Sequence, residues 1–137
     1  MKRGSLRKIK PNQKVIENAE NKAHRDLRVS ITLMKQEEYD WAYTTAYTAM
    51  HTAARALMNK MGYSPPSRDG HRAVVDFLEA QELGQEINKY ARFLDRMRRT
   101  RHRVMYDEYD LISEKGANQA NKWAKEFIAL IEEKLKE

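Results

Sequence analysis

The sequence contains no cysteine, only three prolines and five glycines, and no long hydrophobic run. The absence of cysteine excludes a disulfide scaffold, a thiolate metal site and a thiol nucleophile, and it fits a reducing compartment. A membrane-spanning helix needs about 20 consecutive apolar residues, which this chain does not have. The first ten residues also lack the apolar core of a secretory signal, so we expect a cytoplasmic protein.

What remains is a chain of 137 residues, of which 41% are hydrophobic and 34% charged. This balance can bury the core of one domain while the surface stays solvated. The 26 basic and 20 acidic residues leave a net charge of +6, and residues 1–10 hold five basic residues and no acidic one. We therefore expect a basic tail over residues 1–10, either solubilising or in contact with nucleic acid, and a single helical domain over residues 11–137.

Strong helix formers dominate the composition, and apolar residues recur at spacings of three and four, so the predicted fold is all-α. The first long helix carries Pro11 in its first turn, and a second runs from Tyr39 to about Met61. A third runs from about Gln85 to Tyr109, and Ser113 caps a fourth that continues to the C-terminus. Four long amphipathic helices with short connections predict an antiparallel up-and-down four-helix bundle.

Residues 62–70 form the one stretch that is rich in turn-forming residues. It predicts a loop, followed by an extra short helix that Asp69 caps. Before this loop, small residues repeat along the second long helix and would let another helix approach closely: Ala42, Ala46, Ala49, Ala53 and Ala56. This alanine row either packs inside the monomer or contributes to a dimer interface.

Positive charge is densest between residues 92 and 103, where six arginines are opposed only by Asp95. Four of them follow helical spacing and would form a ridge able to bind successive phosphates: Arg92, Arg96, Arg99 and Arg103. The same pattern fits a solvated helix face whose arginines pair with nearby acids.

Arg101 stands apart from this ridge, because its spacing from Leu94, Met97 and Val104 places it on the apolar face of the helix. Burying an unpaired cation is unfavourable by several kcal/mol, so Arg101 needs a structural carboxylate or lies in a cleft for an anionic ligand. The second long helix carries a polar row that would line the same cleft: Thr44, Thr48, His51 and Arg55. A structural hydrogen-bond network is the alternative explanation of this row.

The histidines do not have metal-ligand spacing together with acidic neighbours, so no bound metal is expected. His71 opens the short helix and is positioned to reach the mouth of the cleft, and His102 follows Arg101 directly. No glycine-rich phosphate loop is present, and no cofactor is expected.

Two stretches of the chain, Glu37 to Leu78 and Arg96 to Ile131, together resemble the HEPN domain family (higher eukaryotes and prokaryotes nucleotide-binding). The first resembles the family's second helix, its Gly-Tyr loop and the histidine that opens the next helix. The resemblance is to the small stand-alone prokaryotic members, and it covers nearly all of the chain after the tail. It implies a homodimer that binds RNA or nucleotide and that is often encoded with a minimal nucleotidyltransferase, as a toxin and antitoxin pair.

Family members that cleave RNA carry an arginine, a polar residue after it and a histidine a few positions later. In metal-independent cleavage the arginine stabilises charge on the phosphate, while the histidine moves the proton of the ribose 2′-hydroxyl. By resemblance, Arg101 and His102 match the first two positions, and Tyr106 stands where the histidine would be. Tyrosine, with a pKa of about 10, is a poor base at neutral pH, so the anion-binding half of the motif is intact while ribonuclease activity is open.

Three hypotheses follow from these observations. In the first, a HEPN domain binds RNA or nucleotide at a cleft around Arg101 and works with a minimal nucleotidyltransferase, for which Tyr106 or Tyr109 is the candidate acceptor. In the second, the protein is a metal-independent endoribonuclease that uses Arg101, His102 and Tyr106. In the third, it is a helical dimer that recruits partners through its alanine-rich or basic surfaces. The candidate nucleic-acid contacts are the four ridge arginines with His51 and His71.

Overall fold

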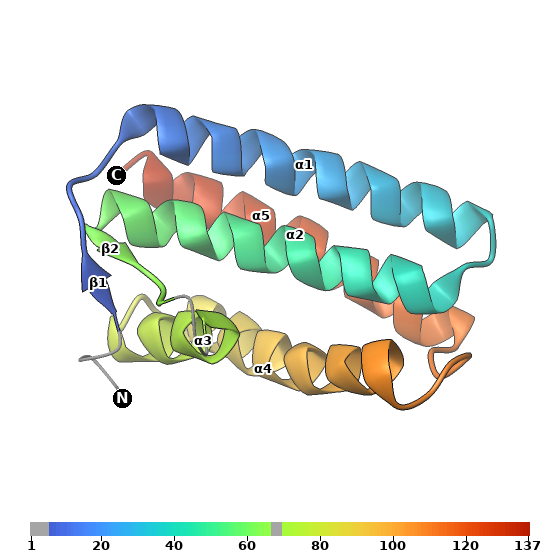
Figure 1. Cartoon of the computed structure of the whole chain (residues 1–137). Helices are drawn as coiled ribbons and strands as arrows, with labels where there is room; N and C mark the ends of the chain where they lie inside the picture. The colour runs from blue at the N-terminus through green and yellow to red at the C-terminus, as the bar shows by residue number, and fades with distance from the viewer. Residues whose placement is uncertain (1–5, 67–69) are drawn as a thin grey trace.

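The computed structural model describes residues 6–66 and 70–137, which form five helices and two short strands. In chain order these are β1 (Arg7–Lys8), α1 (Gln13–Lys35), α2 (Tyr39–Lys60), β2 (Tyr63–Ser64), α3 (Gly70–Ala80), α4 (Gln85–Tyr106) and α5 (Glu114–Leu135). The four long helices run alternately in opposite directions, and the short α3 lies beside the first half of α4 (Figure 1). The predicted all-α class and the antiparallel bundle with an extra short helix are confirmed. None of the helices described is long and apolar enough to cross a membrane.

The N-terminal ends of α5 and α1 test the capping residues predicted from the sequence. The side chain of Ser113 accepts a hydrogen bond from the backbone N–H of Gly116 at 3.0 Å, which confirms the predicted cap of α5. At α1 the cap is Asn12, whose side chain accepts from the N–H groups of Lys14 and Val15. Pro11 therefore precedes the helix, and its predicted place in the first turn is wrong, because the Asn12 side chain satisfies the first exposed N–H groups. The predicted Asp69 cap lies outside the described residues.

Helix α4 begins at Gln85 as predicted but ends at Tyr106, three residues before the predicted Tyr109. Arg103 bonds Glu108 through its side chain at 2.8 Å, and its carbonyl accepts from the N–H groups of both Asp107 and Glu108. Acidic side chains are also unfavourable at the negative end of a helix dipole, and residues 107–110 contain three of them. The chain accordingly leaves the helix and turns towards α5.

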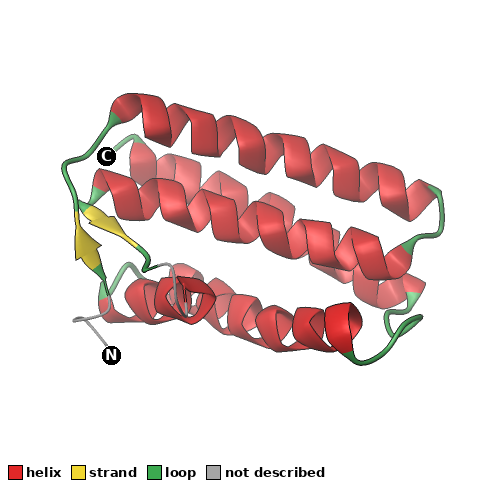
Figure 2. Ribbon diagram, in the orientation of Figure 1, coloured by secondary structure: helices red, strands yellow, loops and turns green. Residues whose placement is uncertain are grey.

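Two short strands, which the sequence pattern did not predict, pair at one end of the bundle (yellow in Figure 2). They are antiparallel, with Arg7 opposite Ser64 and Lys8 opposite Tyr63. The N–H of Ile9 donates to the carbonyl of Gly62, a glycine whose positive φ of 91° turns the chain out of α2. Part of the basic tail is thus paired with the segment after α2, whereas residues 1–5 lie outside the described part of the chain.

Helix α2 is the centre of the core and packs against α1, α4 and α5. The largest fully buried side chains come from α2 and its neighbours: Tyr47, Met50, Met58, Phe77, Leu94, Met97 and Phe127. All members of the alanine row on α2 are buried as well. Small side chains let neighbouring helices approach α2 closely, so this row is used inside the monomer and is not a dimer surface.

Candidate functional site

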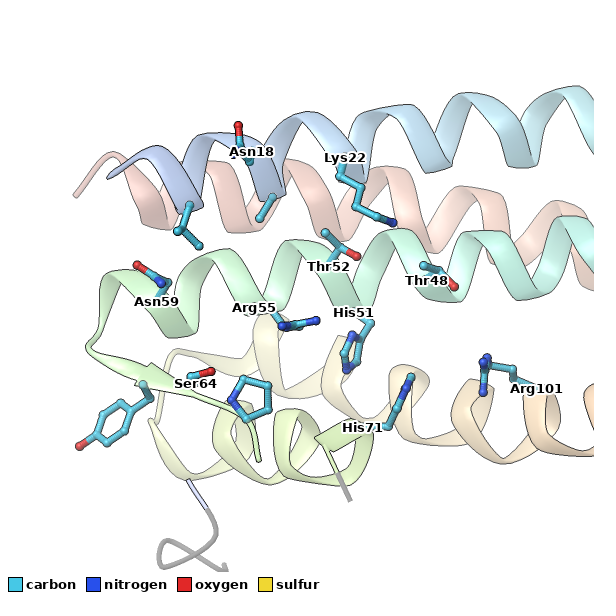
Figure 3. A pocket seen from close by; sticks show the side chains of 14 residues that line it. Asn18, Lys22, Thr48, His51, Thr52, Arg55, Asn59, Ser64, His71 and Arg101 are labelled. Carbon is cyan, nitrogen blue, oxygen red and sulfur yellow. The ribbon is translucent and has the colours of Figure 1, made fainter. Parts of the chain in front are cut away.

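A pocket of about 480 Å³ lies beside α2 and is lined by residues of α1, α2, β2, α3 and α4. We call it the histidine pocket, because His51 of α2 and His71 of α3 lie side by side in it (Figure 3). Lys22 reaches it from α1 and Arg101 from α4 (Figure 3). No residue of its described lining is acidic.

Only part of the polar row predicted on α2 lines this pocket. Thr48, His51 and Arg55 line it, together with Thr52. Thr44 does not line it; this residue is buried, and its hydroxyl donates to the carbonyl of Asp40 at 2.9 Å within its own helix. The helical spacing of the row therefore continues past the end of the pocket, and its first member has a structural role.

The two histidine rings stack with centroids 4.4 Å apart, and the hydroxyl of Tyr47 lies 2.6 Å from Nδ1 of His71. Burial raises the pKa of Tyr47 well above its ordinary value, so its hydroxyl stays protonated and donates to Nδ1. A neutral imidazole that accepts at Nδ1 carries its proton on Nε2. His71 is thereby oriented as a hydrogen-bond donor through Nε2.

Both histidines are neutral at physiological pH for reasons that the geometry makes plain. Burial, together with the neighbouring His71, Arg55 and Arg101, lowers the pKa of His51 to about 3. Burial also lowers the pKa of His71, again with help from Arg101 and Arg55. The guanidinium groups of Arg55 and Arg101 thus lower the pKa of both His51 and His71, so the two cations lie near one histidine pair.

Arg101 is half-buried, as its position on the apolar face of α4 indicates. Its guanidinium carbon lies 5.9 Å from the centroid of the Tyr47 ring, and its buried Nε has no hydrogen-bond partner among the described residues. Across residues 6–66 and 70–137, neither Arg101 nor Arg55 forms an ion pair. Nε2 of His51 is likewise buried without a partner in this part of the chain. Buried polar groups are normally satisfied, so these atoms mark a place where a polar partner fits.

A second pocket, of about 520 Å³, shares Arg101 and His71 with the first. We call it the arginine pocket, because Arg72, Arg98, Arg99 and Arg103 also line it, with His102. Apart from Arg101, the arginines of this pocket have acidic partners. Asp95 bonds Arg98 at 3.0 Å and Arg99 at 2.8 Å, and Glu108 bonds Arg103 at 2.8 Å.

The remaining sequence-predicted site residues lie farther from these pockets. Arg92 and Arg96 are exposed on α4 and line neither one. Tyr106 is 68% exposed and also lines neither, although its ring lies 4.9 Å from that of His102. The structure therefore brings Arg101 together with His51, His71 and His102, but not with Tyr106.

Tyr47 is the site residue that the sequence analysis missed, because its helical spacing from Tyr43, Met50 and Ala54 is that of a core residue. A buried tyrosine hydroxyl usually needs a hydrogen-bond partner, and that requirement was the available signal. The described residues hold no group of three or more side chains suited to a metal ion.

Comparison with known proteins adds two findings. The HEPN domain family matches the sequence over residues 16–134. Among solved structures, the fold is similar to that in the crystal structure of TT1696 from Thermus thermophilus, with a TM-score of 0.68 over 87% of this chain and 97% of that one. The two sequences are 20% identical, so this likeness concerns the fold alone. No curated protein gives a significant sequence match.

Proposed function

This chain belongs to the HEPN domain family, whose role is related to nucleotides and RNA, and we propose that it binds the phosphate of a nucleotide or RNA in the histidine pocket. The observation that carries the proposal is the guanidinium of Arg101. It lies at a pocket without acidic lining residues, next to a neutral histidine pair, and has no ion-pair partner in the described residues.

An arginine in this setting is well suited to a phosphate. Its planar guanidinium donates two parallel hydrogen bonds to phosphate oxygens, and such charge-assisted bonds are stronger than neutral ones. Neutral histidines and threonine hydroxyls add donors without adding charge. Thr52 lines the same pocket and supplies such a hydroxyl, whereas the hydroxyl of Thr48 donates to the carbonyl of Thr44 at 3.1 Å.

The test is a binding titration with a fluorescent single-stranded RNA in EDTA at constant ionic strength. Arg101→Ala is expected to weaken binding by about ten- to a hundredfold, the range for losing a hydrogen bond to a charged group. Lys125→Ala is the charge-matched control, because Lys125 is exposed on α5 and lines neither pocket. Circular dichroism confirms that both variants are folded. Equal affinities of Arg101→Ala and wild type would overturn the proposal.

Metal-independent cleavage of RNA is a second candidate function, favoured by one observation. His71 and His102 both line the arginine pocket with Arg101, so two imidazoles flank the cation that would stabilise the phosphate. The same reactions, separated on a denaturing gel, test this function. Cleavage that persists in EDTA and is lost in Arg101→Ala and in His102→Ala supports it, whereas intact RNA in all reactions contradicts it. Tyr106→Phe is expected to cleave as the wild type does, because Tyr106 lines neither pocket.

We further propose that the protein acts with a minimal nucleotidyltransferase, as a toxin and antitoxin pair. The support is the exposure of two tyrosines that follow the arginine cluster, since Tyr106 is 68% and Tyr109 86% exposed. Their hydroxyls are accessible to an enzyme that transfers a nucleotide. Incubation with the transferase from the same genome and labelled ATP should label the wild type, and Tyr106→Phe or Tyr109→Phe should lose the label. Absence of label in the wild type contradicts this part of the proposal.

HEPN proteins commonly dimerise, and we propose a homodimer for this chain as well. Because the alanine row is buried within the monomer, the interface has to use other surfaces. Size-exclusion chromatography with light scattering should give twice the mass of one chain, which is 16.2 kDa. A monomeric mass at all concentrations would contradict it.

A further inference from the structure

The arginines around the two pockets fall into two classes according to whether an acid neutralises them. Arg98 and Arg99 share Asp95, and Arg103 is bonded to Glu108. A guanidinium that already pairs with a carboxylate attracts a further anion only weakly. In the arginine pocket, therefore, most guanidinium groups are already bonded to a carboxylate, although Arg98 and Arg99 share a single one.

The histidine pocket has fewer cations, and two of its three have no ion-pair partner among the described residues. Arg55 and Arg101 form no ion pair with any described residue, and both lower the pKa of His51 and of His71. Lys22, the remaining cation of the lining, is bonded to Asp26 at 2.8 Å. The histidines themselves carry no charge at neutral pH. Two uncompensated positive charges therefore act on this pocket.

From this charge count we propose that the histidine pocket takes a phosphomonoester, the terminal phosphate of a nucleotide or of an RNA end, in preference to an internal phosphodiester. A phosphomonoester carries a charge of about −1.5 to −2 at pH 7 and presents three terminal oxygens. An internal phosphodiester carries one charge and two such oxygens. Two guanidinium groups neutralise a phosphomonoester fully, whereas an internal phosphodiester leaves one of the two groups unpaired.

The hydrogen-bonding groups of the pocket agree with this choice. Tyr47 holds His71 with its Nε2 as a donor, and Thr52 offers a hydroxyl. The orphaned Nε of Arg101 and Nε2 of His51 are further polar atoms without partners in the described chain. A third terminal oxygen therefore meets donors rather than apolar surface. The inference rests on the proposed function and narrows the ligand of that same site.

The first experiment compares three small ligands that differ only at the phosphate: adenosine, adenosine 5′-monophosphate and its methyl ester. Calorimetric titration at fixed ionic strength, in EDTA and at pH 7.5, gives their dissociation constants. The monophosphate is expected to bind about ten- to a hundredfold more tightly than the methyl ester, the value of one more charged hydrogen-bonding contact. Adenosine is expected to bind more weakly than either.

Substitution of the second cation separates this preference from general attraction to a basic protein. Arg55→Gln removes one of the two uncompensated charges, and Arg55 is exposed, so the fold is not disturbed. The preference for the monophosphate over its methyl ester should fall to within about threefold, because a single remaining charge suits both ligands. Lys125→Gln lowers the net charge equally and should keep the full preference.

RNA oligonucleotides distinguish the two sources of the terminal phosphate. Hexamers with a 5′-phosphate, a 3′-phosphate or only hydroxyl ends are titrated against the wild type. Tighter binding of a phosphorylated hexamer supports an RNA end, and competition by the mononucleotide alone supports a free nucleotide. Equal binding of the monophosphate and its methyl ester, with RNA still bound through Arg101, overturns this inference and leaves the proposed function standing. Failure of every ligand to bind overturns the proposed function itself.

Discussion

The structure holds two pockets of similar volume and opposite charge, one at the start of α2 and the other along its second half. The acidic pocket, of about 460 Å³, is lined by Trp41 and Tyr109 and by four acids: Glu37, Glu38, Asp40 and Asp110. The histidine pocket, of about 480 Å³, holds three cations and no acid among its described lining. The two pockets are nearly equal in volume. They differ in the sign of their charged side chains and in the groups to which these side chains are bonded.

In the acidic pocket the central charge is used by the fold. The carboxylate of Asp40 accepts hydrogen bonds from the backbone N–H of Asp110 at 2.7 Å and of Ile112 at 2.9 Å. It also lies in the first turn of α2, where the helix dipole favours a negative charge. Arg55 and Arg101 have no comparable partners in the described chain. Charge that is bonded within the chain supports the structure, whereas charge left without a partner is available to a ligand.

The largest effect that would sharpen this comparison is the loss of Asp40. Asp40→Ala leaves two backbone donors without their acceptor and releases the segment between α4 and α5. We expect the free energy of unfolding to fall by about 3 kcal/mol, since each bond to a charged acceptor contributes about 1.5 to 3 kcal/mol and water replaces part of it. Urea denaturation measures the change. An unchanged midpoint would mean that the acidic pocket is no more structural than the histidine pocket.

A pH effect is expected from His51, absent at neutral pH and comparable to the Asp40 effect only at the acidic end of the range. Its pKa is about 3 in the folded protein, against about 6.5 in the unfolded chain, so below pH 6.5 the unfolded state binds the proton first. Stability is therefore complete at neutral pH and falls by about 1.4 kcal/mol per unit as the pH drops from about 6 towards 3.5. His51→Gln stays neutral at every pH. Denaturation curves of both proteins at several pH values should show a shallower dependence in the variant, and parallel curves would contradict the buried neutral histidine.

A smaller effect, of opposite sign to that of Asp40, is expected at Arg101. Replacing a half-buried cation that has no carboxylate partner by an apolar chain of similar length removes its desolvation penalty. Arg101→Met should leave the stability equal or raise it by up to about 1 kcal/mol, while it weakens ligand binding by about ten- to a hundredfold. Thermal denaturation and the RNA titration are measured on the same sample. A strong loss of stability would reveal a structural role and would break the contrast with Asp40.

The smallest effect is expected for the outer arginines of α4. Arg92 and Arg96 are exposed and line neither basic pocket. The double substitution of both by alanine should change the affinity for a mononucleotide by less than about twofold, because exposed charges at a distance are largely screened by salt. For a longer RNA the salt dependence of binding should become shallower. A large loss of mononucleotide affinity would extend the ligand site along the whole predicted ridge.

Local patterns predicted much of the fold because the signals lie within a few residues of one another. The Ser113 cap and the end of α2 near Met61 depend on side chains and backbone of the same turn. The end of α4 was misplaced because it depends on contacts outside the helix, among them the bond from Asp110 to Asp40, which is 70 residues away. The paired strands were not predicted either, because two residues in each strand are too few to show a periodic pattern and their partners are distant in the sequence.

In the candidate site, too, features that depend on one helix were predictable, whereas contacts between helices were not. Helical spacing was sufficient to place Arg101 on an apolar face, and the structure indeed half-buries it. The contact of Tyr47 with His71 depends on how α3 docks against α2, which no spacing within one helix encodes. The pairing of Arg99 with Asp95 is a helical i, i+4 contact that was visible in the sequence as an alternative to the phosphate-binding ridge.

The paired strands β1 and β2 bear on the residence time of a ligand, which is distinct from the lifetime of the fold. Ser64 and the adjoining Pro65 form part of the wall of the histidine pocket, and Arg7 holds this wall through bonds to Ser64 and the carbonyl of Pro65. A pairing of two residues a strand opens far more readily than a helical bundle does. We therefore expect the wall to open more often than the bundle unfolds. For the proposed phosphate ligand, the residence time would then depend on these few bonds, and the lifetime of the fold on the packing of α2.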